Sequence, residues 1–242
     1  MIGKDILEKY ATKNQTSFLN VAREYFQHFF LAIFYKQKGC ENFLLKGGTV
    51  LKLVFGSPRL SEDLDFSGIK NGVVYESILI EVLNDLAKEG FQVELKESKP
   101  TSGGFLAILK VNLYGAEFEF FQEVSFRPEK SLPKELALVS SEIIPSYRVY
   151  LLDKEMLVTE KLNALLTRQK PRDFFDLYYI FINQQLRQFL KLNSENRKQI
   201  LDFLGKQDKK KINQELKNLL PKSFWPLIKD LPGALERELG KK

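Results

Sequence analysis

Two carboxylates lie two residues apart at Asp63 and Asp65, shortly after the glycine pair Gly47 and Gly48. In an extended segment alternate side chains share one face, so both carboxylates would point the same way. Paired carboxylates repel each other unless a divalent cation neutralises them. Mg²⁺ is coordinated by a few carboxylate oxygens and keeps coordination positions free for substrate phosphate. A Gly-Gly turn that runs into a helix offers backbone N–H groups to an anion. Together the motifs predict a site for a metal-bound triphosphate.

Either motif alone is weak evidence, because most Asp-x-Asp pairs are solvated and most Gly-Gly pairs before a helix are only turns. Their occurrence within about twenty residues is much more specific. The segment from Arg59 to Phe66 reads as a strand after a Gly-Ser-Pro break. With a period of two, Arg59 and Ser61 fall on the face of the two aspartates and add donors there.

A third carboxylate is expected from the alternating run Glu117 to Phe126, where Glu119 and Glu123 share one face. Two-metal phosphoryl transfer draws carboxylates from more than one strand. Glu119, flanked by two phenylalanines, fits the strand pattern better. The alternative is that both glutamates are solvated residues of an edge strand.

A pair of helices follows in the second half of the sequence. Asp153 is a plausible N-cap for a helix to about Arg168, and Lys161 falls in its apolar stripe, where a lysine needs a partner or a cleft. Pro171 suits the first position of a second helix, on which acidic residues cluster in an otherwise apolar sequence. Buried carboxylates require cations or hydrogen-bond donors. For Asp173, a structural Arg–Asp clasp between helices is a nearly equal alternative to a role in chemistry.

The sequence resembles the AbiEii/MenT-like nucleotidyltransferases. In that family a Gly-Gly-Thr turn precedes an Arg-x-Ser-x-Asp-x-Asp strand, and a Glu-Lys-Leu-x-Ala motif precedes Arg-x-Lys-Pro-Arg-Asp and Tyr-Asp-Leu. The two blocks span about Phe43 to Ile180, with Phe175 in place of the usual Tyr. The matching residues are Gly47, Gly48, Thr49, Arg59, Ser61, Asp63, Asp65, Glu160, Lys161, Leu162, Ala164, Arg168, Lys170, Pro171, Arg172, Asp173, Asp176 and Leu177.

The resemblance implies roles for these residues. Asp63 and Asp65 would hold Mg²⁺ (or Mn²⁺), and Glu123, whose context Glu-Val-Ser-Phe-Arg fits the family slightly better than that of Glu119, would complete the site. Lys161 would contact the nucleotide phosphates and Asp176 would support the site. The other residues expected to bind nucleotide are Gly47, Gly48, Thr49, Arg59, Ser61, Arg172 and Asp173.

The resemblance also implies a reaction and a setting. The enzyme would move NMP from an NTP to an acceptor hydroxyl, with the 3′ end of tRNA as the expected acceptor, and would act as the toxin of a bacterial toxin–antitoxin pair with a cognate antitoxin. Two alternatives stay open: nucleotidyl transfer to a protein side chain, and a non-catalytic RNA-binding module that kept the fold. A pure protein-interaction partner is a further rival class.

Composition sets bounds on these expectations. The chain has 242 residues, 44% of them hydrophobic, a net charge of +6 and a pI near 9.1, which allow a sizeable core and a polyanionic partner. Cys40 is the only cysteine and His28 the only histidine, so an intrachain disulfide and multi-histidine metal chemistry are excluded. We expect no membrane span and a cytoplasmic location.

The expected fold is α+β, a nucleotidyltransferase-like mixed, mostly antiparallel sheet of about five strands flanked by helices and followed by a helical C-terminal half. Residues 1–150 would form the sheet domain, and residues 151–242 a helical domain that completes the nucleotide cleft. The segment from Pro128 to Tyr150, which contains three prolines, reads as a connection. The Lys209-Lys210-Lys211 run is by default a solvated helical face, and a basic RNA-docking surface is the sharper alternative.

Overall fold

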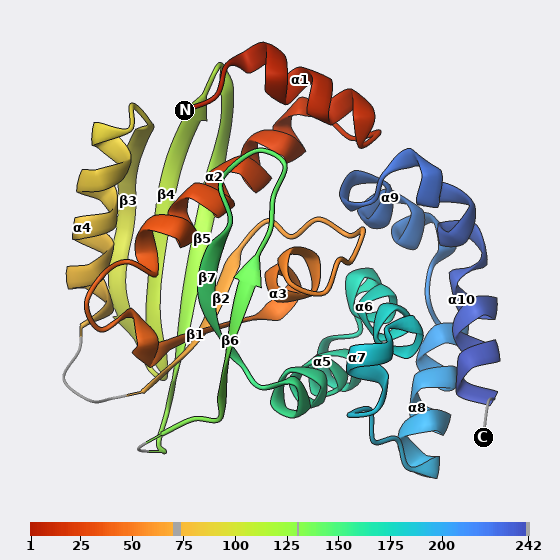
Figure 1. Cartoon of the computed structure of the whole chain (residues 1–242). Coiled ribbons are helices and arrows are strands. Elements are labelled where there is room, and N and C mark those ends of the chain that lie inside the picture. The colour runs from red at the N-terminus through yellow and green to blue at the C-terminus, as the bar shows by residue number, and fades with distance from the viewer. Residues whose placement is uncertain (70–73, 130, 241–242) are drawn as a thin grey trace. The chain divides into compact units, whose positions relative to one another are not determined.

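The computed structural model describes residues 1–69, 74–129 and 131–240 (Figure 1). The chain divides into two compact units. The sheet unit comprises Met1–Val54 and Leu60–Leu152, and the helical unit comprises Phe55–Arg59 and Asp153–Lys242. The helical unit is therefore discontinuous in sequence.

The sheet unit contains a seven-stranded mixed sheet with strand order β3-β4-β5-β2-β1-β7-β6. β2 runs parallel to β5 and β1 parallel to β7, whereas the other neighbours are antiparallel. The α+β class with a mixed sheet is confirmed, with two more strands than the five expected. The strands are β1 (Phe43–Lys46), β2 (Leu64–Ile69), β3 (Gln92–Thr101), β4 (Gly104–Leu113), β5 (Ala116–Arg127), β6 (Lys134–Val139) and β7 (Tyr147–Leu152).

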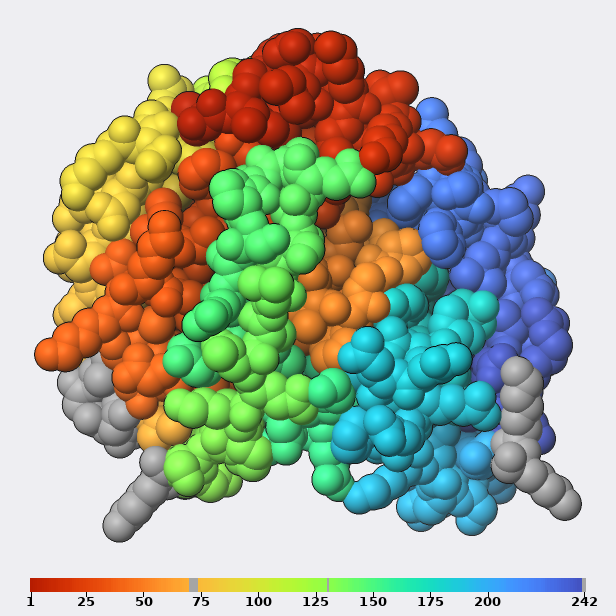
Figure 2. Space-filling view, viewed as in Figure 1, coloured from red at the N-terminus to blue at the C-terminus, as the bar shows by residue number. Residues whose placement is uncertain are grey.

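The two additional strands, β6 and β7, lie in the segment that the sequence analysis interpreted as a connection, and that interpretation was wrong. Pro133 and Pro145 stand just before the two strands and not within them. Proline is tolerated there because no ladder hydrogen bond is lost. β6 is an edge strand, and the green segment that carries it lies on the surface in Figure 2.

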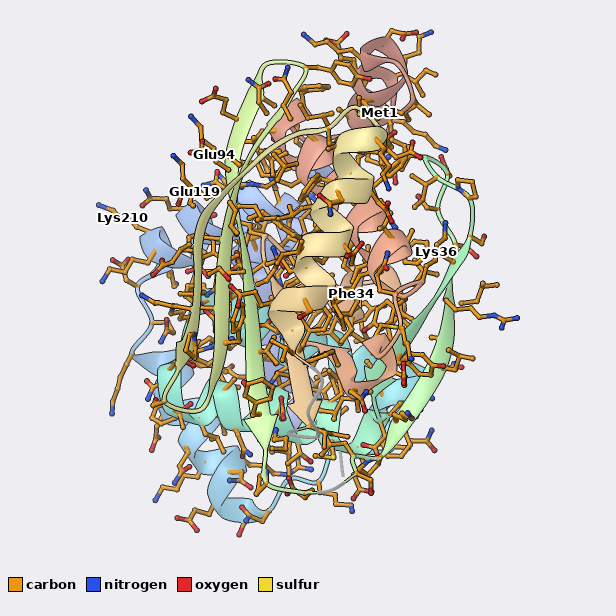
Figure 3. The ribbon with its side chains drawn as sticks, turned by 90° about the vertical axis from the view of Figure 1, so that its left-hand side faces the viewer. Met1, Phe34, Lys36, Glu94, Glu119 and Lys210 are labelled. Carbon is orange, nitrogen blue, oxygen red and sulfur yellow. The ribbon has the colours of Figure 1, made fainter. Side chains whose placement is uncertain are left out.

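The helices of the sheet unit are α1 (Lys4–Lys13), α2 (Phe18–Phe34), α3 (Gly47–Leu53) and α4 (Tyr75–Lys88), with a 3₁₀ turn at Cys40–Asn42. α2 and α4 cover one face of the sheet, and α1 packs against α2. Figure 3 shows α2 and α4 along the same side of the sheet and labels Phe34, which is fully buried. Phe26 of α2 meets Phe120 of β5 edge-to-face at 5.0 Å between ring centroids, a favourable aromatic geometry. This packing fixes α2 against the strand that carries the candidate third carboxylate.

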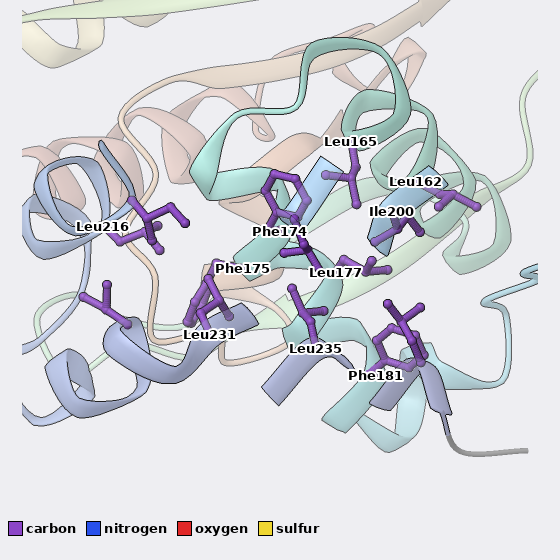
Figure 4. Close-up of a cluster of buried hydrophobic side chains, with 14 of the residues drawn as sticks. Leu162, Leu165, Phe174, Phe175, Leu177, Phe181, Ile200, Leu216, Leu231 and Leu235 are labelled. Atoms are coloured by element: carbon purple, nitrogen blue, oxygen red, sulfur yellow. The ribbon is translucent and has the colours of Figure 1, made fainter. Parts of the chain in front are cut away.

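The helical unit has its own apolar core. Its helices are α5 (Lys154–Arg168), α6 (Pro171–Ile182), α7 (Gln184–Arg187), α8 (Ser194–Gly205), α9 (Lys209–Leu219) and α10 (Trp225–Gly240), with a 3₁₀ turn at Lys222–Phe224. Figure 4 shows buried side chains that meet across these helices, among them Leu165, Phe174, Leu177 and Leu235. The Asp153 N-cap is confirmed, since its carboxylate accepts from the Met156 N–H at 2.8 Å.

Among the described ranges, no helix combines the length and the apolar character needed to cross a bilayer.

Candidate active site

The Gly-Gly turn joins β1 to α3, and Asp65 lies directly against it. Gly47 has φ +77°, a conformation that L side chains rarely adopt. A Cβ added at Gly47 would lie 2.1 Å from Asp65 Oδ2, so a side chain at this position would also displace the carboxylate. The turn therefore requires glycine for two independent reasons, and one of them is the position of Asp65.

Strand register places a second carboxylate beside Asp65. In the parallel β2–β5 pair Asp65 is opposite Glu123, and in the antiparallel β1–β2 pair it is opposite Lys46. Neighbouring strands lie about 4.8 Å apart, so Lys46, Asp65 and Glu123 form a row across three strands. Glu119 lies four residues earlier on β5, about 13 Å away along the strand. The register therefore brings Glu123, and not Glu119, to the side of Asp65.

The segment before β2 differs from the sequence interpretation. Arg59 to Phe66 was expected to be one strand, but β2 begins only at Leu64, and Arg59 belongs to the helical unit. The physical reason is that the Ser61 and Asp63 carbonyls accept hydrogen bonds from side chains and not from a neighbouring strand.

Two buried side chains hold the backbone on either side of Glu62. Gln27 of α2 donates from Nε2 to the Ser61 carbonyl at 2.8 Å, and the Thr49 hydroxyl donates to the Asp63 carbonyl at 2.6 Å. Both side chains are about 1% exposed. Between these two anchors, Glu62 forms an ion pair with Arg23 of α2. Each of the three residues before β2, Ser61, Glu62 and Asp63, is therefore held by a side chain of α2 or α3.

A pocket of about 400 Å³ opens beside this segment. Four of its lining residues are acidic and one is basic, and Phe121 contributes a half-buried ring. The guanidinium of Arg23 lies 5.6 Å from the Phe118 ring centroid, a cation–π distance. The lining residues are Arg23, Glu62, Asp63, Glu119, Phe121 and Glu123. The lining therefore carries a net negative charge, which attracts cations.

The fit to a metal ion can be tested on these side chains. In the part of the chain that the structure describes, no three His, Cys, Asp or Glu side chains converge on a point that could hold a metal. Mg²⁺ is usually bound through one or two carboxylates, several waters and substrate phosphates, without an all-protein cage. Asp65 beside Glu123, with Asp63 in the same pocket as Glu123, fits a cation that binds together with a nucleotide.

The helical unit holds a second charged cluster, centred on Asp176 of α6. Arg59 grips this carboxylate with two bonds, from Nε at 2.6 Å and from Nη2 at 3.0 Å, and Lys161 of α5 donates to it at 2.7 Å. All three side chains are buried. Burial alone would raise the pKa of Asp176, but the two cations outweigh it and lower the pKa to about 2. The cluster holds one anion between two cations.

Asp173 and Arg172 have other partners. Arg168 grips the Asp173 carboxylate at 2.7 and 2.9 Å, and the Lys170 N–H donates to it at 3.2 Å. The backbone N–H of Arg172 donates to Glu215 of α9 at 3.4 Å. These contacts fit the structural Arg–Asp clasp that the sequence analysis kept as an alternative.

The structure thus groups the predicted residues within each unit. The sheet unit brings together Gly47, Gly48, Thr49, Ser61, Asp63, Asp65 and Glu123, and the helical unit brings together Arg59, Lys161 and Asp176. Sequence reasoning missed Lys46, Gln27 and Arg23. Gln27 and Arg23 lie one helical turn apart in a helix rich in aromatic residues. This polar pair was the signal in the sequence that could have indicated their role.

The histidine of α2, His28, is also buried. Its Nδ1 lies 2.9 Å from the Tyr147 hydroxyl of β7. Burial, with a smaller contribution from the Lys52 charge, lowers the pKa of His28 to about 4. The imidazole is therefore neutral in the folded protein at pH 7.

Comparisons with known proteins decide the family. Residues 30–230 match the family model described as "Nucleotidyl transferase AbiEii toxin, Type IV TA system". The chain belongs to the AbiEii family. It is a nucleotidyltransferase, as the sequence motifs predicted. None of the curated proteins matches the chain.

Three solved structures share the fold of this AbiEii protein. MenT4, the nucleotidyltransferase toxin Rv2826c from Mycobacterium tuberculosis H37Rv, is similar with a TM-score of 0.59 and 15% identity, over 99% of this chain and 94% of that one. JHP933 from Helicobacter pylori has a TM-score of 0.57 and 20% identity, over 93% and 94% of the two chains. A putative nucleotidyltransferase from H. pylori has a TM-score of 0.56 and 23% identity, over 91% of each.

Proposed function

We propose that the protein transfers NMP from an NTP to a hydroxyl of an RNA acceptor, the 3′ end of a tRNA. It does so in the cytoplasm, as a toxin with a cognate antitoxin. The acceptor hydroxyl gives its proton to Glu123 or to water as its oxygen bonds to the α-phosphorus, the bond from that phosphorus to the bridging β-phosphate oxygen breaks, and pyrophosphate leaves. The observation that carries the proposal is the β2–β5 register, which sets Asp65 beside Glu123 next to the Gly47 turn.

The carboxylates of the sheet unit would hold Mg²⁺ or Mn²⁺. Asp63, Asp65 and Glu123 supply the oxygen ligands that such cations prefer, and the nucleotide phosphates supply the rest. A bound divalent cation withdraws charge from the phosphates and stabilises the charge that develops during transfer. Glu123 also lies where it can orient the acceptor hydroxyl, because it lines the pocket beside Asp63.

The charged cluster of the helical unit supports binding of the triphosphate. Arg59, Lys161 and Asp176 together carry one net positive charge in a buried setting, where charge is poorly screened. An ammonium has three N–H donors, so Lys161 keeps donors for phosphate oxygens beyond its bond to Asp176. In this proposal Asp176 is a positioning residue that holds the two cations in place.

The test is incubation of the purified protein with each α-³²P-labelled NTP, MgCl₂ and total tRNA, followed by a denaturing gel. Wild type should label tRNA. Asp65→Asn should lower the rate more than about 100-fold, because mutations of outer-shell partners of metal sites already cost 10–100-fold. Glu94→Gln is the matched control, since Glu94 is an exposed β3 carboxylate that pairs only with Lys96 among the described residues.

Each of the other outcomes of this experiment would favour one of the alternative functions or refute the metal site. Label on the protein itself would move the acceptor to a side-chain hydroxyl. Binding of tRNA without transfer from any NTP would favour a non-catalytic RNA-binding module. Equal rates in Asp65→Asn and wild type would refute the assignment of the metal site.

A further inference from the structure

α9 (Lys209–Leu219) has two chemically different faces. Ile212, Leu216 and Leu219 are buried in the core of the helical unit. On another face, lysine and amide side chains recur at helical spacing and line a shallow hollow of about 370 Å³. The lining residues are Lys209, Lys210, Asn213, Gln214 and Lys217, and they include no carboxylate.

Several lysine side chains elsewhere in the described ranges pair with carboxylates. Among them are Lys4, Lys13, Lys88, Lys96, Lys99, Lys110 and Lys191. Within the described ranges, no carboxylate lies within ion-pair distance of Lys209, Lys210 or Lys217. The hollow therefore carries positive charge that the rest of the chain does not neutralise.

The nearest acids on α9 already have partners. Asp208 caps the helix by accepting from the Lys210 N–H at 2.8 Å, and Glu215 accepts from the Arg172 N–H at 3.4 Å. Lys217 lies 5.0 Å from the centroid of the Trp225 ring, which holds the ammonium in place. Figure 3 labels Lys210, whose side chain extends away from the ribbon.

The spacing of the cations indicates an extended anion. Lys210 and Lys217 are seven residues apart, which is about 10 Å along a helix. That span corresponds to about three phosphates of one nucleic-acid strand at 3.4 Å per residue. Asn213 and Gln214 lie between the two lysines, and amide side chains donate to phosphate oxygens and ribose hydroxyls. A single phosphate could not engage the whole row.

We infer that this face of α9, the residues that line the hollow, binds the sugar–phosphate backbone of the RNA acceptor. The identity of the RNA rests on the proposed function, whereas the contact itself is electrostatic and independent of sequence. Nucleotidyl transfer to a bound RNA then depends on this face through the KM for the RNA, not through kcat.

The test compares two triple variants with the same change of charge. One is Lys209→Gln/Lys210→Gln/Lys217→Gln. The matched control, Lys96→Gln/Lys99→Gln/Lys110→Gln, removes three lysines of β3 and β4 that already pair with carboxylates of β3 and β5. Binding of fluorescein-labelled tRNA is followed by fluorescence anisotropy without NTP, from 50 to 300 mM NaCl. Circular dichroism checks that both variants keep the fold.

Loss of three phosphate contacts should lower the slope of log K against log salt by about 2, since each contact contributes about 0.7–0.9. The control should keep the wild-type slope. Equal slopes in wild type and the α9 variant, or no binding of tRNA by wild type, would overturn the inference.

The inference and the proposed function can fail separately. Asp65→Asn should bind tRNA as wild type does, because Asp65 lies on the sheet and not on α9. If wild type transfers no nucleotide but the two triple variants still differ in binding, the proposed function fails and the α9 surface stands. If wild type transfers nucleotide to tRNA but the α9 variant shows an unchanged KM for tRNA, the proposed function stands and the inference about α9 fails.

Discussion

Replacing Asp176 by asparagine should destabilise the protein strongly. The substitution keeps the shape of the side chain but removes the anion between Arg59 and Lys161. The pKa of Asp176 is about 2 in the folded protein against an ordinary 3.8. At about 1.4 kcal/mol per unit, this difference corresponds to about 2 kcal/mol of stability. Removing one partner of a buried ion pair typically costs 3–5 kcal/mol, because the remaining charge is uncompensated.

We therefore expect the free energy of unfolding to fall by about 2–5 kcal/mol, measured by urea denaturation at pH 7. For a chain of this size the midpoint of thermal unfolding should fall by about 5–15 °C. Asp230→Asn is the matched control, because Asp230 forms a comparable pair with Arg237 on the exposed surface of α10. Exposed pairs contribute less than about 1 kcal/mol.

The pH dependence gives a second check on the same carboxylate. Because the folded pKa of Asp176 lies below the unfolded one, its contribution is complete above about pH 4 and is lost as the pH falls towards 2. The stability difference between wild type and Asp176→Asn should therefore shrink between pH 4 and pH 2. Equal destabilisation by Asp176→Asn and Asp230→Asn at pH 7 would refute the electrostatic account of the cluster.

Three further predictions concern the sheet unit. Gly47→Ala should cost about 1–2 kcal/mol in backbone strain and also abolish transfer, whereas Gly115→Ala, at φ +87° with open space around it, should show the strain alone. Gln27→Leu leaves the Ser61 carbonyl without its donor, so urea denaturation should show a loss of about 1–3 kcal/mol, and transfer should slow. Because the pKa of His28 is lowered to about 4, wild type should lose up to about 3 kcal/mol as the pH falls from 6.5 to 4, a loss that His28→Gln should remove.

Features that depend on neighbouring residues were predictable from the sequence. The helix that begins after Asp153 and the helix that begins at Pro171 appear where they were expected, because capping and the fixed φ of proline act locally. The turn of the β4–β5 hairpin is local in the same way, since Tyr114 and Gly115 at its tip both have positive φ. The family motifs placed the two aspartates and their phosphate turn in the same region of the chain.

Features that depend on distant segments were not predictable. The strand pattern of β5 alone favoured Glu119 over Glu123, and only the parallel register with β2 sets Glu123 beside Asp65. The period of two from Arg59 to Phe66 suggested a strand, but contacts with α2 and α3 override it. The apolar stripe of α5 showed that Lys161 needed a partner, without revealing that Asp176 of α6 and Arg59 would share it.

The discontinuity of the helical unit has a consequence for inheritance. Phe55–Arg59 belongs with residues far downstream, since the Tyr179 hydroxyl donates to the Phe55 carbonyl and Arg59 grips Asp176. A recombination event at Asp153 that joined the halves of two diverged relatives would take Arg59 from one parent and Asp176 from the other. Such chimaeras survive only when both parents agree on this pairing, so gene exchange among relatives is constrained by a five-residue loop far from the crossover point.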